Sequence, residues 1–484
     1  MAAFLSMSAL AGCVGKKNTD QASNTPKATV APKEKTKLQF FTWSTGAQTD
    51  IQASIDDYNK TNKDNIEIET LFRSGDWQTP LRTMLAAAQG PDIMHGTPNR
   101  TESILNGWIE PWDSYMSKEF KERVKGTEVI VVVNGKPQTF DFTFAMKSKR
   151  MLYNKDLFKE AGLDPNKPPK SLADFREYAK KITEKGAGKY YGTAFPIAKN
   201  NTYLMVDAFL NMEGLYNNWD YKTGTYKYSV LAPYFEFYKQ MMADKSVFPG
   251  AESMDNDAVR SQFAAGKVGM LMSGLSWDVK AVNDQFKATI DWAASPIPTL
   301  DGKEPKSPYA VRPSSAYNLY SGSKNKPAAM KVVEFFMSDK YLGMYYEKAI
   351  DMVTINSAVV NAKAPTDKML AQWPMFAPTV AKDLTIPVGI GPSSGTLDGD
   401  NDVQTFEKIL LTNVDIKKSL ADLDKRYMDA MTKQIPIDLE KAKSNKMVID
   451  TIGKIPVDPS FDYLKPDFTK VKYISFDEWK AMSK

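Results

Sequence analysis

Residues that could act as nucleophiles or metal ligands are scarce in this sequence. Its 484 residues include one His, at position 95, and one Cys, at position 13. A zinc site needs three or four nitrogen, sulfur or oxygen ligands, and a Ser or Cys nucleophile normally needs a His beside it. His95 could assist such a site but cannot build one alone. We therefore expect no metal, no cofactor and no catalytic residues, and we expect His95 to be structural.

The charge of the chain gives no sign of a nucleic-acid partner. Lys and Arg number 63 against 58 Asp and Glu, a net charge of +5, and no basic block or stripe stands out. Six lysines in and beside one N-terminal stretch exceed this whole surplus, so the rest of the chain should be nearly neutral. They are Lys16, Lys17, Lys27, Lys33, Lys35 and Lys37.

The N-terminus has the features of an export segment. Residues 1–13 form an apolar, small-residue run that ends Leu-Ala-Gly-Cys, the pattern of a bacterial lipobox in which Cys13 carries the lipid. The alternative is an ordinary small-residue stretch with one Cys. Residues 14–36 contain no aromatic residue, which predicts a disordered tether. No 18-residue apolar stretch follows Cys13, so we expect no membrane span in the body.

The elements that must position any site alternate between strands and helices. Strand-like runs at 38–43, 66–68 and 91–94 enclose two helical patterns, which predicts an α/β lobe. Asn134-Gly135 predicts a hairpin, and Ser171 with Asp174 has the spacing of a capping box at a helix start. A later helix is expected from about Ile416 to Met431.

Three residues at an expected strand end and in an expected loop are candidate contacts. Trp43 ends the first strand, and in open α/β sheets the carboxyl ends of strands face the ligand crevice. Asp76 and Trp77 form a polar and aromatic pair in the loop before the next helix. Each has a structural alternative. Trp43 could be a core residue packed at the end of the strand, and Asp76 with Trp77 could only pack at the start of the helix.

An ordered series of motifs resembles the extracellular solute-binding proteins of bacterial ABC importers, and within them the carbohydrate-binding group. The lipobox begins the series. The motifs that follow are PDI at 91–93, GWIEPW at 107–112, YNKDLFKEAGL at 153–163, PKSLADF at 169–175, and FAAGKVGM at 263–270 with GLSW at 274–277.

The resemblance implies a two-lobed, type II periplasmic-binding-protein-like α/β fold, with hinge-linked lobes that close on a ligand cleft. It places the hinge crossings near 143–147, 257–261 and 312–316. The implied parts are residues 37–145 plus 262–312 for lobe one, 146–261 plus 313–433 for lobe two, and 434–484 for a C-terminal extension that lies outside the family pattern.

The resemblance also implies ligand contacts. Sugars present apolar faces that stack on aromatic rings and a rim of hydroxyls that pair with planar carboxylates, amides or guanidinium groups. Trp277 matches a stacking Trp of the family, and Asn99 replaces a carboxylate, while Gly96 replaces an aromatic residue. Further implied contacts are Arg100, Arg312 and Asp400. Arg312 could instead pair with a carboxylate. Asp400 and its neighbours Asp398 and Asp402 also have the spacing of a calcium-binding loop, but the rest of that motif is missing.

The function implied is that of a lipid-anchored, monomeric receptor on the outer face of the cell membrane. It would capture a carbohydrate, with an oligosaccharide as the expected ligand, and deliver it to an ABC transporter permease, with no nucleic acid involved. One alternative is a receptor for another polar solute such as a peptide. The other is an anchored glycoside hydrolase, which needs two carboxylates about 5–10 Å apart; no such pair stands out in the sequence.

Overall fold

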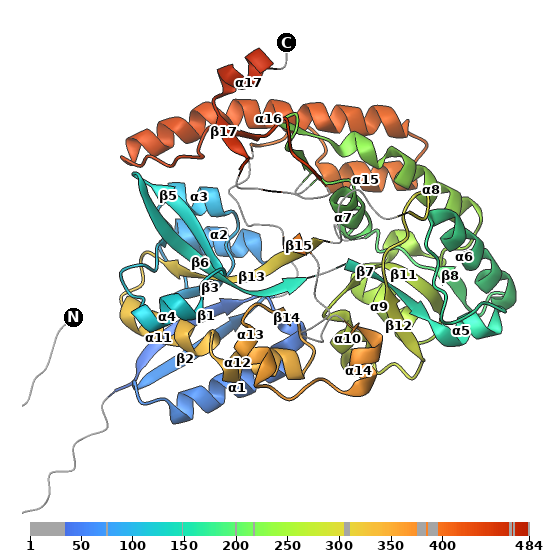
Figure 1. Ribbon diagram of the computed structural model, residues 1–484, viewed down its shortest axis with the longest axis horizontal. Helices are drawn as coiled ribbons and strands as arrows, with labels where there is room; N and C mark the ends of the chain where they lie inside the picture. Colours follow the sequence, from blue (N-terminus) through green and yellow to red (C-terminus); the bar gives the residue numbers. More distant parts are fainter. Residues whose placement is uncertain are drawn as a thin grey trace, which may run out of the picture. The chain divides into compact units, whose positions relative to one another are not determined.

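The larger of two main sheets forms the first lobe (Figure 1). The computed structural model describes residues 34–73, 76–147, 149–198, 201–215, 218–303, 310–374, 384–385, 395–463, 467 and 470–482. The strands of this sheet are β1 Thr36–Thr42, β2 Ile66–Phe72, β3 Ile93–His95, β4 Ile109–Glu110, β5 Glu128–Val133, β6 Lys136–Lys147, β13 Ala310–Tyr320, β14 Met352–Val353 and β15 Leu384–Thr385. Their main order is β14-β6-β13-β3-β1-β2, with β5 beside β6. Strands β1, β2 and β3 are parallel, whereas β13 runs antiparallel to β3 and β6.

Helices cover both faces of this sheet, as expected for parallel strands. Phe40 and Phe41 are neighbours on β1 and point to opposite faces, so each enters a different core. The Phe40 core takes residues from α1, α11 and α12, and the Phe41 core takes residues from α2 and α3. The helices of this lobe are α1 Gln48–Thr61, α2 Gln78–Ala86, α3 Arg100–Leu105, α4 Lys118–Arg123, α11 Lys326–Phe336, α12 Asp339–Glu347 and α13 Asn356–Val360.

The second lobe is built on a four-stranded sheet in the order β12-β7-β11-β8. Its strands are β7 Lys149–Asn154, β8 Tyr191–Thr193, β11 Val268–Leu275 and β12 Trp292–Ser295. Its helices are α5 Lys155–Glu160, α6 Leu172–Gly186, α7 Tyr203–Met212, α8 Ala232–Ala243, α9 Asn256–Ala264, α10 Asp278–Lys280, α14 Asp367–Gln372 and α15 Asp402–Leu411. Within the described ranges, no helix has the length and apolarity that crossing a bilayer requires.

Two local sequence signals are confirmed. Asn134 and Gly135 have φ values of 53° and 71° and join β5 to β6, because both residues tolerate the positive φ that a tight hairpin needs. The side chain of Ser171 accepts a hydrogen bond from the Asp174 backbone, and the Asp174 side chain accepts one from the Ser171 backbone, which completes the capping box of α6.

The strand pairing corrects the expected division of the chain between the lobes. Strands β11 and β12 pair in the sheet of the second lobe, although residues 262–312 are expected in the first. Strand β13 lies in the first lobe, although 313–433 are expected in the second. The crossing expected near 257–261 is wrong, since it falls inside α9, which packs on β11. The cause is non-local: β11 pairs with both β7 and β8, and nothing in the local sequence specifies those partners.

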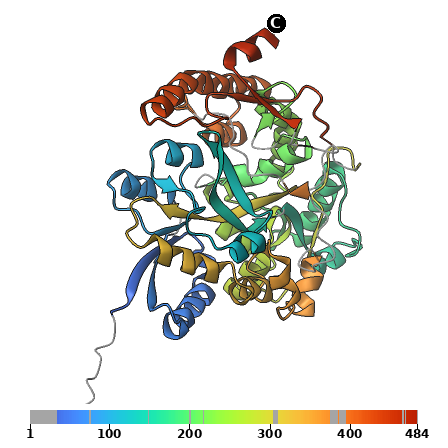
Figure 2. The same cartoon turned by 60° about the vertical axis from the view of Figure 1, so that its left-hand side comes forward.

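The chain after the second lobe forms one long helix, α16 Ile416–Ser444, which continues past the expected end near Met431. It passes through Pro436, where the missing N–H and the ring normally cost a helix about 3 kcal/mol. Ile435 and Ala442 are buried on either side of this proline, and their packing offsets that cost. Figures 1 and 2 show α16 extending from α15 and α8 of the second lobe to α3 and β5 of the first.

The C-terminal segment, residues 434–482, is attached to both lobes. On the first lobe, Ile449 bridges to Val133, and the Val448 N–H donates to the Asn134 side chain at 2.7 Å. The segment then returns to the second lobe. Its elements there are β16 Ile455–Val457, β17 Lys472–Ile474 and α17 Phe476–Met482, which lie beside the hairpin of β9 Trp219–Asp220 and β10 Thr225–Tyr226.

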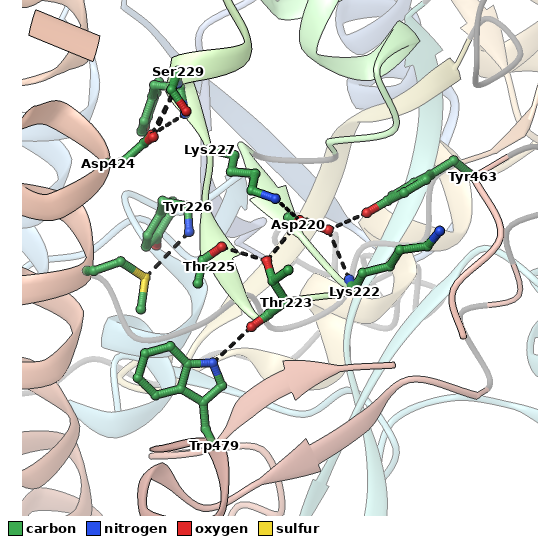
Figure 3. Close-up of polar contacts among 12 residues, drawn as sticks. Asp220, Lys222, Thr223, Thr225, Tyr226, Lys227, Ser229, Asp424, Tyr463 and Trp479 are labelled. Atoms are coloured by element: carbon green, nitrogen blue, oxygen red, sulfur yellow. Dashed lines mark hydrogen bonds and ion pairs between the residues drawn. The ribbon is translucent and has the colours of Figure 1, made fainter. Parts of the chain in front are cut away.

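Side chains of the second-lobe hairpin hold the returning segment. The Trp219 indole donates to the Pro456 carbonyl at 2.9 Å. Tyr463 donates to the Asp220 carboxylate, and the Trp479 indole donates to the Thr223 carbonyl at 3.0 Å (Figure 3). These bonds assign the C-terminal extension, whose position the sequence leaves open, to a place on both lobes.

Burial of Ile455 should make this attachment part of the stability of the fold. The side chain of Ile455 is fully buried in the core of the second lobe, so Ile455→Ala should lower the free energy of unfolding by about 2–5 kcal/mol. Val448, which is 64% exposed, gives the control: Val448→Ala should change it by less than about 0.5 kcal/mol. Urea denaturation of both variants tests this, and equal midpoints would contradict it.

Candidate functional site

Two tryptophans stand together where the parallel strands of the first lobe end. Trp43 directly follows β1, and Trp77 directly precedes α2. Their ring centroids are 6.5 Å apart and their planes differ by 20°. Gly96, just after β3, completes the group: a Cβ there would lie 3.6 Å from the Trp77 ring and 3.8 Å from the Trp43 indole nitrogen. The rings thus lie at the carboxyl ends of the strands, where ligands bind in open α/β sheets.

His95 lies directly beneath this aromatic pair and is structural, as expected. Its ring centroid is 4.5 Å from that of Trp43, and its Nδ1 is 2.8 Å from the hydroxyl of Thr42. Burial, with a smaller contribution from the Lys147 ammonium, lowers the pKa of His95 to about 3. The imidazole is therefore neutral at physiological pH and supports Trp43 without adding charge.

Lys147 is a site residue that the sequence analysis missed. It ends β6, and its Nζ lies 4.6 Å from the centroid of the Trp43 ring, within the range of a cation–π contact. Burial lowers the pKa of Lys147, while the nearby carboxylates of Asp351 and Asp278 oppose the shift. The sequence did contain a signal for this residue, because Lys147 lies at the carboxyl end of a strand and at an expected hinge crossing.

The second lobe contributes Trp277 together with a buried ion pair. The Arg260 guanidinium carbon lies 4.7 Å from the centroid of the Trp277 ring, and the same guanidinium binds the Asp278 carboxylate at 2.5 Å. Arg260 and Asp278 are 4% and 2% exposed. Burial raises the pKa of Asp278, and the Arg260 charge partly offsets this rise. A charge this deeply buried requires such a partner, and the paired guanidinium lies over the ring of Trp277.

Contacts between the lobes bring Trp277 to the aromatic pair of the first lobe. The ring of Trp277 lies against Gly46, where any β-carbon would collide with it. Next to it, the Ser276 hydroxyl donates to Asp351 at 2.7 Å, and Lys280 forms an ion pair with Asp50 at 2.7 Å. Three of the residues expected in the site, Trp43, Trp77 and Trp277, therefore lie in one region between the lobes.

Three other residues expected to contact the ligand have hydrogen-bond partners within the protein. Asn99 caps α3 by accepting from the Glu102 backbone at 2.9 Å, and Asp76 accepts from the Thr79 backbone at 3.2 Å at the start of α2. Hydrogen bonds from Thr79 also lower the pKa of Asp76. Arg100 donates to the buried Asp141 carboxylate at 2.9 Å. The structural alternative left open for Asp76 is the arrangement observed.

The remaining expected positions do not join this group. Asp400 pairs with Lys408 at 3.5 Å, and its carbonyl accepts from Arg426, so it braces α15 against α16. Only the backbone of Arg312 is described, and it pairs with Lys147 between β13 and β6. Cys13 lies outside the described residues. Among those that are described, no group of three His, Cys, Asp or Glu residues could hold a metal ion.

Comparisons with known proteins agree on one family. Residues 42–342 match the family described as bacterial extracellular solute-binding protein. A putative binding protein of Brucella abortus (strain 2308) is 30% identical over 268 residues, which are 53% of this chain. The match spans 60% of the length of that relative.

Solved structures with the same fold include two that hold sugars. A solute-binding protein of an ABC transporter from Thermotoga lettingae TMO, bound with alpha-D-tagatose, is 19% identical with a TM-score of 0.62; the match covers 82% of this chain and 100% of that one. The maltose/maltodextrin-binding domain MalE from Bdellovibrio bacteriovorus, bound to maltotriose, is 17% identical with a TM-score of 0.62, covering 81% and 99%. These likenesses establish the type II two-lobed fold.

The buried neutral His95 should make stability depend on pH. The folded chain keeps His95 neutral down to about pH 3, whereas the unfolded chain protonates it below its ordinary pKa of 6.5. The unfolded state then binds more protons, so this group should lower the free energy of unfolding by up to about 1.4 kcal/mol per pH unit as the pH falls from 6.5 towards 3.

Urea denaturation of the wild type and His95→Asn between pH 4 and 8 measures this contribution. Asn retains a polar atom near Thr42 but does not titrate. The variant should therefore lose less stability than the wild type as the pH falls. Parallel curves for the two proteins would show that His95 does not titrate as its burial requires.

Proposed function

The chain belongs to the bacterial extracellular solute-binding protein family, and from that membership we propose that it captures a carbohydrate and delivers it to an ABC transporter permease. The family match spans residues 42–342, which includes the strand ends of both lobes. The sugar-bound structures of the same fold support the choice of a carbohydrate, and the maltotriose complex supports an oligosaccharide.

The aromatic residues between the lobes carry this proposal. Trp43 and Trp77 offer flat apolar surfaces from the first lobe, and Trp277 of the second lobe packs against Gly46, three residues after Trp43. Lys147 and the pair of Arg260 and Asp278 border these rings. The rings match the apolar faces of a sugar, and the charged side chains beside them match its hydroxyl groups. A peptide ligand would instead require backbone donors and acceptors along an extended edge.

The carboxylates near the rings favour a receptor over a glycoside hydrolase. A hydrolase needs one carboxylic acid and one carboxylate free to act across the scissile bond. Asp278 is bound by Arg260, and Asp351 accepts from Ser276. Asp141 is held by Arg100. Because these three carboxylates are held by partners within the protein, we propose that the bound sugar is released without being cleaved.

A panel of sugars tests the function directly. The wild type is mixed with glucose, maltose, maltotriose, raffinose and stachyose, and with a dipeptide mixture as the alternative class. A ligand at about 100 times its Kd should stabilise the fold by about 2.7 kcal/mol, which thermal unfolding detects. Stabilisation by a sugar with no product on chromatography fits the proposal. A cleaved product, or a response to the peptides alone, would reject it.

The same assay on tryptophan variants localises the site. Trp43→Ala removes a stacking surface and should weaken the binding of the selected sugar by about tenfold or more. Trp108 is half-buried beside the core of the first lobe and is not among the residues proposed to contact the sugar, so Trp108→Ala gives the matched control. An equal loss of affinity in the two variants would show that the effect is one of stability and not of stacking.

We propose further that Cys13 is acylated and tethers a monomeric receptor to the outer face of the cell membrane. The Leu-Ala-Gly-Cys pattern and the polar stretch at 14–36 support this. In cells, the wild type should remain with the membrane fraction, whereas Cys13→Ser should appear in the soluble fraction. Ser6→Ala, in the same segment, is the control. Retention of Cys13→Ser on the membrane would contradict the tether.

A further inference from the structure

A groove outside the aromatic site separates the first lobe from the C-terminal half of α16. Its volume is about 390 Å³, within the range of small-molecule pockets. Residues from α2 and α3 line one wall, residues from α16 line the other, and Gly395 with Thr396 close one end. The wall from α16 lies beyond residue 342, where the family match ends. The family match therefore covers one wall of the groove and not the other.

The groove begins near the aromatic pair. Asn99 lines it and stands three residues after Gly96, which touches Trp77 and Trp43. Three residues span at most about 11 Å between Cα atoms. Arg82 lines the same wall and lies five residues beyond Trp77, on the first turns of α2. A ligand that stacks on the two rings could thus extend into the groove if it is longer than one sugar unit.

The polar groups of the groove are balanced in charge and held in place. Arg82 donates three hydrogen bonds to the Glu102 carboxylate, at 3.1, 3.2 and 3.1 Å. On the opposite wall, the Gln434 amide donates to Asp438 at 2.8 Å, and Lys441 donates to Asn106, which directly follows α3. The two cations, Arg82 and Lys441, balance the two carboxylates, Glu102 and Asp438. A groove with no net charge suits a neutral ligand better than an anion.

The chemistry of these side chains suits hydroxyl groups. Carboxylates accept from hydroxyls, ammonium and guanidinium groups donate to them, and charged partners strengthen both kinds of bond. No aromatic ring lines the groove. The groove therefore differs from the neighbouring site: it offers hydrogen bonds without stacking. Because its walls are helices, the donors and acceptors stay close to their positions when the groove is empty.

We propose that this groove is an additional subsite, in which Asp438 and Lys441 of α16 bind the far end of an oligosaccharide whose near end stacks on Trp43 and Trp77. The proposal rests on the function proposed above and adds to it a preference for chain length. In this arrangement, the C-terminal segment determines which oligosaccharides the receptor retains.

Calorimetric titration across sugars of increasing length tests the subsite. Glucose, maltose, maltotriose and maltotetraose form one series, and sucrose, raffinose and stachyose another. In whichever series the wild type binds, affinity should rise with length. Lys441→Met and, separately, Asp438→Asn should weaken the binding of the longest sugar by about tenfold, and leave that of the shortest bound sugar unchanged.

Lys443→Met is the matched control, because Lys443 lies on the same helix but is exposed and does not line the groove. It should bind every sugar as the wild type does. Two variants from one wall, each checked for an unchanged thermal unfolding midpoint, keep the test valid if one of them folds poorly.

The outcomes separate this proposal from the function on which it rests. A wild type that binds no sugar of either series contradicts the proposed function, and the subsite with it. A wild type that binds sugars with no dependence on length overturns the subsite alone. So does an equal loss for the shortest and longest sugars in Lys441→Met and Asp438→Asn, since a subsite at the far end acts only on the longer ligand.

Discussion

The antiparallel pairing of β6 with β13 determines where the two lobes meet. Lys147, the last residue of β6, pairs with Arg312 on β13, and the chain enters β7 of the second lobe directly after this point. The pairing therefore attaches one of the chain segments that cross between the lobes to the sheet of the first lobe. It also brings Lys147 close to the ring of Trp43, near Asp351 of the first lobe and Asp278 of the second. The position of Lys147 in the site follows from this register.

Buried charge then decides which aromatic residues can be held between the lobes. Arg260 would be costly to bury alone, and Asp278 balances it. The guanidinium face that remains lies over Trp277 and holds its ring against Gly46. On the other side, a neutral His95 supports Trp43, and the Lys147 ammonium lies against the same ring. The two lobes thus hold their rings by different means: an ion pair on one, a neutral ring and a cation on the other.

The sequence predicted those features whose causes are local. The turn at Asn134-Gly135 and the cap at Ser171 depend on residues within a few positions, and the structure contains both. Trp43 and Trp77 could be predicted as candidate contacts because ligands of open α/β sheets bind at the carboxyl ends of the strands. Arg260 was not, since its partners depend on how α9 packs beside β11, and the same non-local pairing made the expected lobe boundary near 257–261 wrong.

The C-terminal segment constrains the motion on which such a receptor depends. Hinge closure moves one lobe against the other, and only segments joined to both resist it. Ile449 is paired with Val133 of the first lobe, whereas the Pro456 carbonyl accepts from Trp219 of the second, seven residues along. Seven extended residues reach about 25 Å, so the lobes can separate only as far as this short connection allows without breaking one attachment. The groove beside α16 is bounded differently: Lys441 donates to Asn106, and Asn445 donates to the Leu105 carbonyl at 2.7 Å, so these contacts set the distance between its two walls.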